Sequence, residues 1–111
     1  MKSKTNKFNA RKVEYKGIIF DSNKEFERYL ILQDMEKKGE IEKLKLQHEF
    51  VLIPDNEVFK GVKYRADFYY WKDFKPVIED TKGLRKGAAY SLYVIKKKLM
   101  YSQFKIIIQE I

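Results

Sequence analysis

Cysteine is absent from the 111 residues, and histidine occurs once, as His48. A disulfide scaffold, a thiolate metal site, a cysteine nucleophile and a multi-histidine zinc site are therefore excluded. Long apolar runs are also missing, because no stretch approaches the roughly 18 residues that cross a bilayer. The opening MKSKTNKFNARK lacks the apolar core of a secretory signal. We therefore expect a soluble cytoplasmic protein with no membrane partner, in which any metal is bound by carboxylates.

The composition favours one folded domain. Hydrophobic residues make up 44% of the chain and aromatic residues 15%, which is enough apolar surface to stabilise a compact fold. A chain of 111 residues leaves no room for a second core. Residues 1–12 are polar and basic, which is typical of a flexible arm. We therefore expect a basic arm over residues 1–12 and a single domain over residues 13–111.

Acidic residues are missing from two segments that are rich in bases. Residues 1–12 carry five Lys or Arg and residues 82–109 carry seven, with no acid in either segment, and the formal net charge of the chain is +8. A polyanion such as nucleic acid is a natural partner for this pattern, because phosphate neutralisation releases counterions. A solvated basic surface explains the same pattern.

Hydrophobic periodicity predicts an α/β or α+β fold with the order hairpin, helix, three strands, helix, strand. The expected elements are a hairpin over 12–20, a helix over 22–38, strands over 41–53, 62–71 and 76–82, a helix over 88–103 and a strand over 104–110. Ser22 and Glu25 match a capping box that begins the first helix, and Gly39 supplies the left-handed position that ends it.

Two elements have apolar patterns that predict their buried faces. In strand 62–71 every second residue from Val62 to Tyr70 is apolar or aromatic, so these residues are expected to share one face. The second helix carries an apolar stripe, with Lys97 expected on the opposite side. The stripe has four members: Ala88, Leu92, Ile95 and Leu99.

Two carboxylates and a lysine fall on the predicted hairpin of strands 62–71 and 76–82. Side chains alternate along a strand, so Asp80 and Lys82 point to the same side and Glu79 points to the other. If Asp67 shares the side of Asp80, the two carboxylates can bind a divalent ion with Lys82 beside it. An ordinary solvent-facing hairpin with scattered charges is the alternative, because a D…DxK pattern is short.

A third acid lies on the first helix. Glu25 shares a mostly apolar stripe with Tyr29 and Leu32, so it should face inward, whereas Glu27 should stay in solvent. A buried carboxylate needs a partner, and a metal held by the sheet is one. Capping of the first helix also explains Glu25, and the two roles are compatible.

The order of these residues resembles the PD-(D/E)XK, or restriction-endonuclease-like, nuclease superfamily. The segments FDSNKEFERY, GEIEKLKLQ, YRADFYY and VIEDTKG further resemble a family of small phage proteins of largely unassigned function that look like Holliday-junction resolvases. The resemblance implies a mixed sheet flanked by helices, one or two Mg²⁺ ions replaceable by Mn²⁺, and hydrolysis of DNA in the cytoplasm of a host cell. Arg65 and Ala66 precede Asp67 where the superfamily has its nominal proline, so the match departs from the pattern there.

The resemblance also implies roles for individual residues. Asp67 and Asp80 would be metal ligands, the Thr81 carbonyl a third, Glu25 an auxiliary ligand and Lys82 the group that orients water. Contacts to the DNA backbone are expected from basic residues near both ends of the domain. These residues are Lys12, Arg85, Lys86, Lys96 and Lys97.

The sequence thus supports two functional hypotheses. The first is a metal-dependent endonuclease acting on branched or structured phage DNA, which requires a homodimer if a four-way junction is the substrate. The second is a nonenzymatic basic protein that binds nucleic acid with salt-sensitive affinity and without metal. The three acids favour the nuclease, because a simple binding protein does not need carboxylates that repel phosphate.

Overall fold

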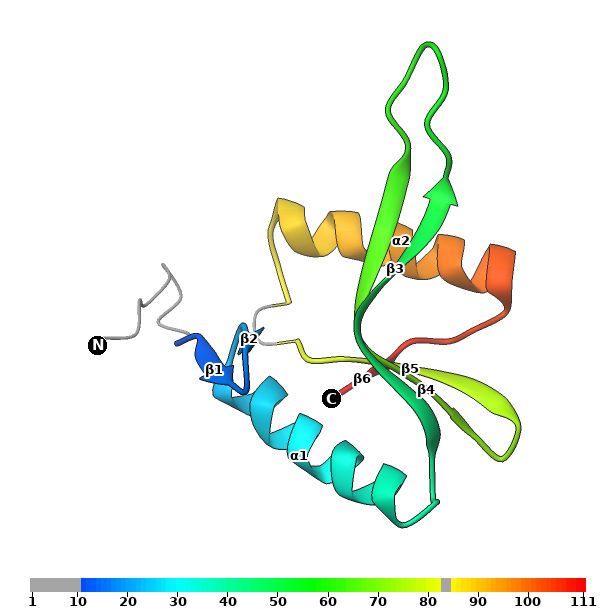
Figure 1. The fold of residues 1–111 in the computed structure, drawn as a ribbon. Coiled ribbons are helices and arrows are strands. Elements are labelled where there is room, and N and C mark those ends of the chain that lie inside the picture. Colours follow the sequence, from blue (N-terminus) through cyan, green and yellow to red (C-terminus); the bar gives the residue numbers. More distant parts are fainter. Residues whose placement is uncertain (1–10, 83–84) are drawn as a thin grey trace.

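The computed structural model describes residues 11–82 and 85–111 and has an α+β fold (Figure 1). A two-stranded sheet pairs β1 with β2, and a four-stranded sheet has the order β3-β4-β5-β6. The elements are β1 (Val13–Tyr15), β2 (Ile18–Phe20), α1 (Asn23–Lys37), β3 (Glu42–Ile53), β4 (Val62–Lys72), β5 (Lys75–Asp80), α2 (Ala88–Phe104) and β6 (Gln109–Glu110). No helix within the described residues is long and apolar enough to cross a membrane. The predicted arm lies outside the described residues except for its last two positions.

The predicted hairpin and first helix are confirmed. Lys16 and Gly17 form the turn between β1 and β2, both with positive φ (51° and 81°), as a two-residue turn between twisted strands requires. The Ser22 hydroxyl accepts a hydrogen bond of 3.1 Å from the Glu25 amide at the start of α1. After α1, Gly39 has a φ of 77°, a conformation that costs glycine little.

The four-stranded sheet is mixed. β3, β4 and β5 pair antiparallel, whereas β6 lies parallel to β5. The prediction of a long last strand over 104–110 is wrong, because Phe104 belongs to α2 and only Gln109–Glu110 pairs in the sheet. Ile106 and Ile108 are nevertheless buried. The apolar residues of this segment therefore pack in the core although they lie outside the paired strand.

The apolar residues of β4 divide between two cores. Tyr64 and Ala66 pack in the core that includes α2, whereas Phe68 and Tyr70 pack in the core that includes α1. All four are buried at every second position, as the alternation predicted, but they contribute to two cores rather than to one. The change occurs opposite Gln47, whose φ of 52° interrupts the regular extended backbone of β3.

The two cores place the helices against different parts of the long β3–β4 hairpin, whose tip projects beyond the rest of the domain (Figure 1). In register, Leu46 pairs with Phe68 and His48 with Ala66, so Asp67 lies between them on β4. Asp67 is therefore located where the strand passes from one core to the other.

The predicted buried stripe of α2 is wrong for three of its four members, because Ala88, Leu92 and Ile95 are exposed and only Leu99 packs against the core. Leu92 and Ile95 are 50% and 55% exposed, whereas Tyr93 and Met100 are buried against the sheet. Lys97 lies on the side of Tyr93 rather than on the solvent side, and its amine contacts Glu110. α2 is apolar around most of its circumference, so periodicity alone did not identify the side that packs.

Candidate active site

Asp67 and Asp80 lie where the pairing of β4 with β5 ends. The last register pair of their ladder is Phe68 with Glu79. Beyond it the Asp67 amide donates to Asp80 Oδ1 (3.2 Å), and Asp67 Oδ2 accepts from both the amide and the hydroxyl of Thr81 (2.9 Å each). Carboxylate oxygens thus replace backbone carbonyls as acceptors beyond the β4–β5 ladder. β5 ends at Asp80, which pairs with Glu110 of β6, rather than at the predicted residue 82. The hydrogen bonds to the carboxylates hold the two carboxyl groups next to each other.

Lys82 lies on the Asp80 side of the sheet, as the alternation predicted. Its Nζ is 3.2 Å from Asp80 Oδ2 and 3.9 Å from the centre of the Tyr93 ring. The Tyr64 hydroxyl donates to the same Asp80 oxygen at 2.6 Å. Burial, followed by the charge of Asp80, holds the pKa of Tyr64 far above its usual range, so this hydroxyl stays protonated. Asp80 is therefore fixed by a neutral donor and a cation.

Glu25 faces inward, as predicted, and is only 2% exposed. Burial first, and then the charges of Asp67 and Asp21, raise its pKa from 4.5 to about 7, against the opposing effect of a hydrogen bond from the Asp21 amide. Burial and then the Asp80 charge raise the pKa of Asp67 to about 6. Burial and the charge of a neighbouring carboxylate thus both oppose ionisation of Glu25 and Asp67, so the charged forms are costly without a cation.

The donor chemistry of this cluster fits a hard divalent ion such as Mg²⁺, because its ligating atoms are carboxylate oxygens that repel one another. Asp67 and Asp80 are brought together, and the amide and hydroxyl of Thr81 bond to Asp67. Within residues 11–82 and 85–111, however, no three acidic or imidazole groups form a complete ligand set. Glu25 is therefore an electrostatic neighbour of the aspartate pair rather than part of a finished site.

Glu110 is a site residue that the sequence reasoning missed. It pairs in register with Asp80 across the parallel β5–β6 ladder. Its carboxylate accepts from Lys97 (2.8 Å) and the Tyr93 hydroxyl (3.0 Å), and it lies 2.9 Å from Arg85 Nη1. The Lys97 hydrogen bond is the main cause that lowers the pKa of Glu110. The sequence did contain one indication of Glu110: it is the first acidic residue after the acid-free segment 82–109.

The other predicted DNA contacts are spread around the domain. Lys12 lies 3.7 Å from Asp21, and both side chains are exposed. Lys86 is exposed and Lys96 is half-buried on α2. Only Arg85 and Lys97 among the five predicted residues share a partner, Glu110, and they share it beside the aspartate pair.

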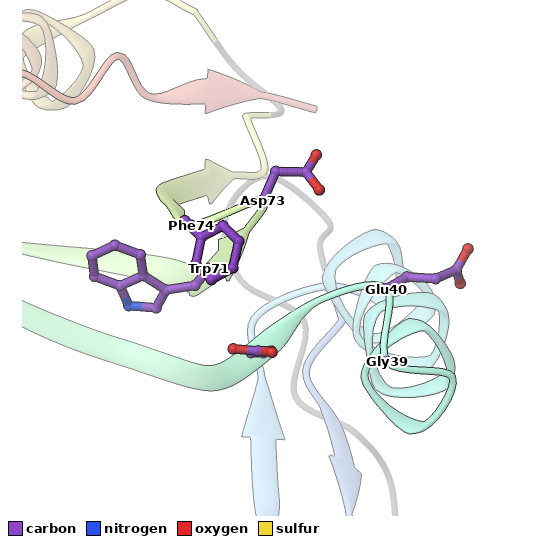
Figure 2. Close-up of a pocket in the computed structure, with 6 residues that line it drawn as sticks. Gly39, Glu40, Trp71, Asp73 and Phe74 are labelled. Atoms are coloured by element: carbon purple, nitrogen blue, oxygen red, sulfur yellow. The ribbon is translucent and has the colours of Figure 1, made fainter.

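A separate cavity of about 140 Å³ lies at the far end of the β4–β5 hairpin. Figure 2 shows the Trp71 and Phe74 side chains on this hairpin, with Glu40 at the end of the α1–β3 connection. The residues that line the cavity are Gly39, Glu40, Glu42, Trp71, Asp73 and Phe74. Neither Asp67 nor Asp80 lines this cavity, so the cavity is not part of the candidate site.

Comparison with known proteins gives one positive result. No curated protein and no solved structure matches this chain. Residues 5–110 match the family described as "Protein of unknown function (DUF1064)". The match extends from before β1 to the end of β6 and includes Glu25, Asp67, Asp80 and Lys82. The chain therefore belongs to the DUF1064 family.

Proposed function

We propose that this protein is a metal-dependent endonuclease with a restriction-endonuclease-like core, which hydrolyses phosphodiester bonds in branched or structured DNA. One observation carries the proposal: Asp67, Asp80 and Lys82 meet at the end of one ladder. Glu25, which is remote in the chain, is buried near enough to Asp67 to be affected by its charge. Such a cluster of acids opposes phosphate binding unless a cation neutralises it.

Each residue of the cluster has a role in this proposal. Asp67 and Asp80 would hold Mg²⁺, with Glu25 as an auxiliary ligand. When bound there, the ion supplies Lewis acidity toward the phosphate and lowers the pKa of a water molecule. Lys82, held by Asp80 and by the Tyr93 ring, places a positive charge where the phosphate gains negative charge in the transition state. Tyr64 keeps Asp80 in place by donating to it.

A cleavage assay tests the proposal directly. The purified protein is incubated with linear, single-stranded, flapped and four-way DNA in Mg²⁺, in Mn²⁺ or in excess chelator. We expect scission with either metal, most on the branched substrates, and none with chelator. Cleavage that persists in chelator would refute the metal requirement. Salt-sensitive binding of every DNA with no scission would instead favour the nonenzymatic binding protein.

The substrate also has a consequence for assembly. Resolution of a four-way junction cuts two strands and needs two active sites, so it requires a homodimer. The molar mass of the protein in solution, measured by light scattering alone and with junction DNA, checks this requirement. Cleavage of flaps by a monomer, without cleavage of junctions, would restrict the substrate to DNA with a single branch.

Glu110→Gln is expected to strengthen DNA binding several-fold. The change removes the negative charge that pairs with Arg85 and Lys97 in the free protein and makes both cations available to phosphates. Each new phosphate contact should steepen the dependence of log K on log salt by about 0.9. Fluorescence anisotropy over a series of salt concentrations measures both quantities.

The control for this change is the same substitution in a protein that already carries Arg85→Met and Lys97→Met. There the effect of Glu110→Gln on affinity should largely disappear. If Glu110→Gln instead weakens binding in the otherwise unchanged protein, Glu110 orients the two cations for DNA rather than neutralising them.

A further inference from the structure

The two neighbouring carboxylates of β5 point to opposite sides of the sheet. Asp80 belongs to the cluster described above, whereas Glu79 points toward α1 and is 1% exposed. Arg28 of α1 donates to both Glu79 oxygens, from Nε at 2.7 Å and from Nη2 at 2.8 Å. The Tyr70 hydroxyl donates to the same carboxylate. Both carboxylate oxygens of Glu79 thus accept from the single guanidinium of Arg28.

Arg28 and Glu25 occupy neighbouring positions on α1. They are three residues apart, which places them about one turn apart on nearly the same side of the helix. A guanidinium bound through two nitrogens fixes direction as well as distance, because its donors lie in one plane. The contact with Glu79 therefore sets both the rotation of α1 and its position along the sheet. Glu25 moves with the helix, so the same contact determines where its carboxyl group lies.

Packing alone already attaches α1 to the sheet. Leu32 is fully buried and forms a core with Ile41, Phe68 and Tyr70. Buried ion pairs are often no more stabilising than apolar residues of similar volume, because both charges lose their hydration. What the pair adds to such a core is orientation. The cost of burying Glu79 is thus consistent with a need to place α1 accurately.

We propose that Arg28 is a positioning residue of the candidate metal site: through Glu79 it holds α1 so that Glu25 stands beside Asp67. This inference rests on the proposed function, because the position of Glu25 matters to chemistry only if the acids bind a cation. Arg28 itself touches neither Asp67 nor Asp80 in any described contact. Its effect on metal binding must therefore be transmitted through Glu25.

The test is a double-mutant cycle on metal affinity, measured by isothermal titration calorimetry of the full chain with Mn²⁺ and with Mg²⁺. Arg28→Lys keeps the charge but cannot bind both Glu79 oxygens in one plane. We expect about tenfold weaker metal binding, at the low end of the losses seen when a group that orients a metal ligand is changed. In a Glu25→Gln background, Arg28→Lys should change the affinity less than about twofold. Lys38→Gln, which breaks the exposed Lys38–Asp34 pair on the same helix, should change nothing.

A second variant keeps the test decisive if Arg28→Lys does not fold. Arg28→Gln combined with Glu79→Gln removes both buried charges together and leaves amides that can bond to each other. It should weaken metal binding as Arg28→Lys does, and again only when Glu25 is present. An equal loss with and without Glu25, or no loss at all, would overturn the positioning role.

The cycle also separates this inference from the proposed function. If the unchanged protein binds neither metal, or if Asp80→Asn binds metal as well as the unchanged protein, both proposals are wrong. If Asp80→Asn loses the metal while Arg28→Lys and the double glutamine variant retain full affinity, only the role of Arg28 is wrong.

Discussion

Asp80→Asn is expected to reduce the rate of DNA cleavage by about 1,000-fold or more, since metal stabilisation of charge in the transition state contributes several kcal/mol. Asparagine has nearly the shape of aspartate and its oxygen can still accept from Tyr64, so the fold should persist. DNA binding should become tighter, because a negative charge that repels phosphate is removed. Single-turnover cleavage and anisotropy titrations on the same branched DNA measure the two effects.

Asp73→Asn is the matched control for this substitution. Asp73 lies on the same hairpin, at the turn between β4 and β5, and is exposed with a φ of 51° that asparagine tolerates well. Its substitution should leave both cleavage and binding unchanged. Undiminished cleavage by Asp80→Asn would remove Asp80 from the chemistry and leave its hydrogen bonds as a purely architectural feature.

Glu25→Gln is expected to stabilise the metal-free protein at pH 8 by on the order of 3 kcal/mol and to have little effect at pH 4.5 or below. The pKa of Glu25 is raised from 4.5 to about 7 by burial and by Asp67 and Asp21. The folded state therefore holds the proton more tightly than the unfolded state, and stability is lost as the pH rises through this interval. A glutamine has no proton to lose, so the variant should not show this loss.

Urea denaturation in the presence of chelator, at pH 4.5 and pH 8, measures the difference between the two proteins. Added Mg²⁺ should then stabilise the unchanged protein at pH 8 more than the variant, because an ionised Glu25 gains a cation. A stability difference that is the same at both pH values would show that the substitution acts through packing or capping rather than through ionisation.

Local rules were sufficient for much of the fold. The turn at Lys16 and Gly17, the cap at Ser22 and the left-handed Gly39 each depend on a few neighbouring residues, and all three were predicted from the sequence. The alternation of side chains along a strand likewise predicted that Lys82 lies on the side of Asp80. The inward position of Glu25 followed from helical spacing, because the residues on its stripe are mostly apolar.

The parts that the sequence did not predict depend on partners far away in the chain. On α2, Tyr93 and Met100 pack in a core with residues of β3, β4 and β5, and Tyr93 and Lys97 also contact Glu110 of β6. The division of β4 between two cores coincides with the positive φ of Gln47 in the neighbouring strand. Neither feature leaves a local pattern in the sequence, because each involves segments that meet only after folding.

Where β4 and β5 separate, aspartate carboxylates replace backbone carbonyls as hydrogen-bond acceptors. Two backbone amides are therefore sensitive to protonation and metal binding of these aspartates. The amide hydrogens of Asp67 and Thr81 point at carboxylate oxygens, so their NMR chemical shifts should move when those oxygens gain a proton or a cation. Amide spectra of isotopically labelled protein can therefore follow pH and metal titrations at two positions without any added probe, even in a variant that no longer cuts DNA.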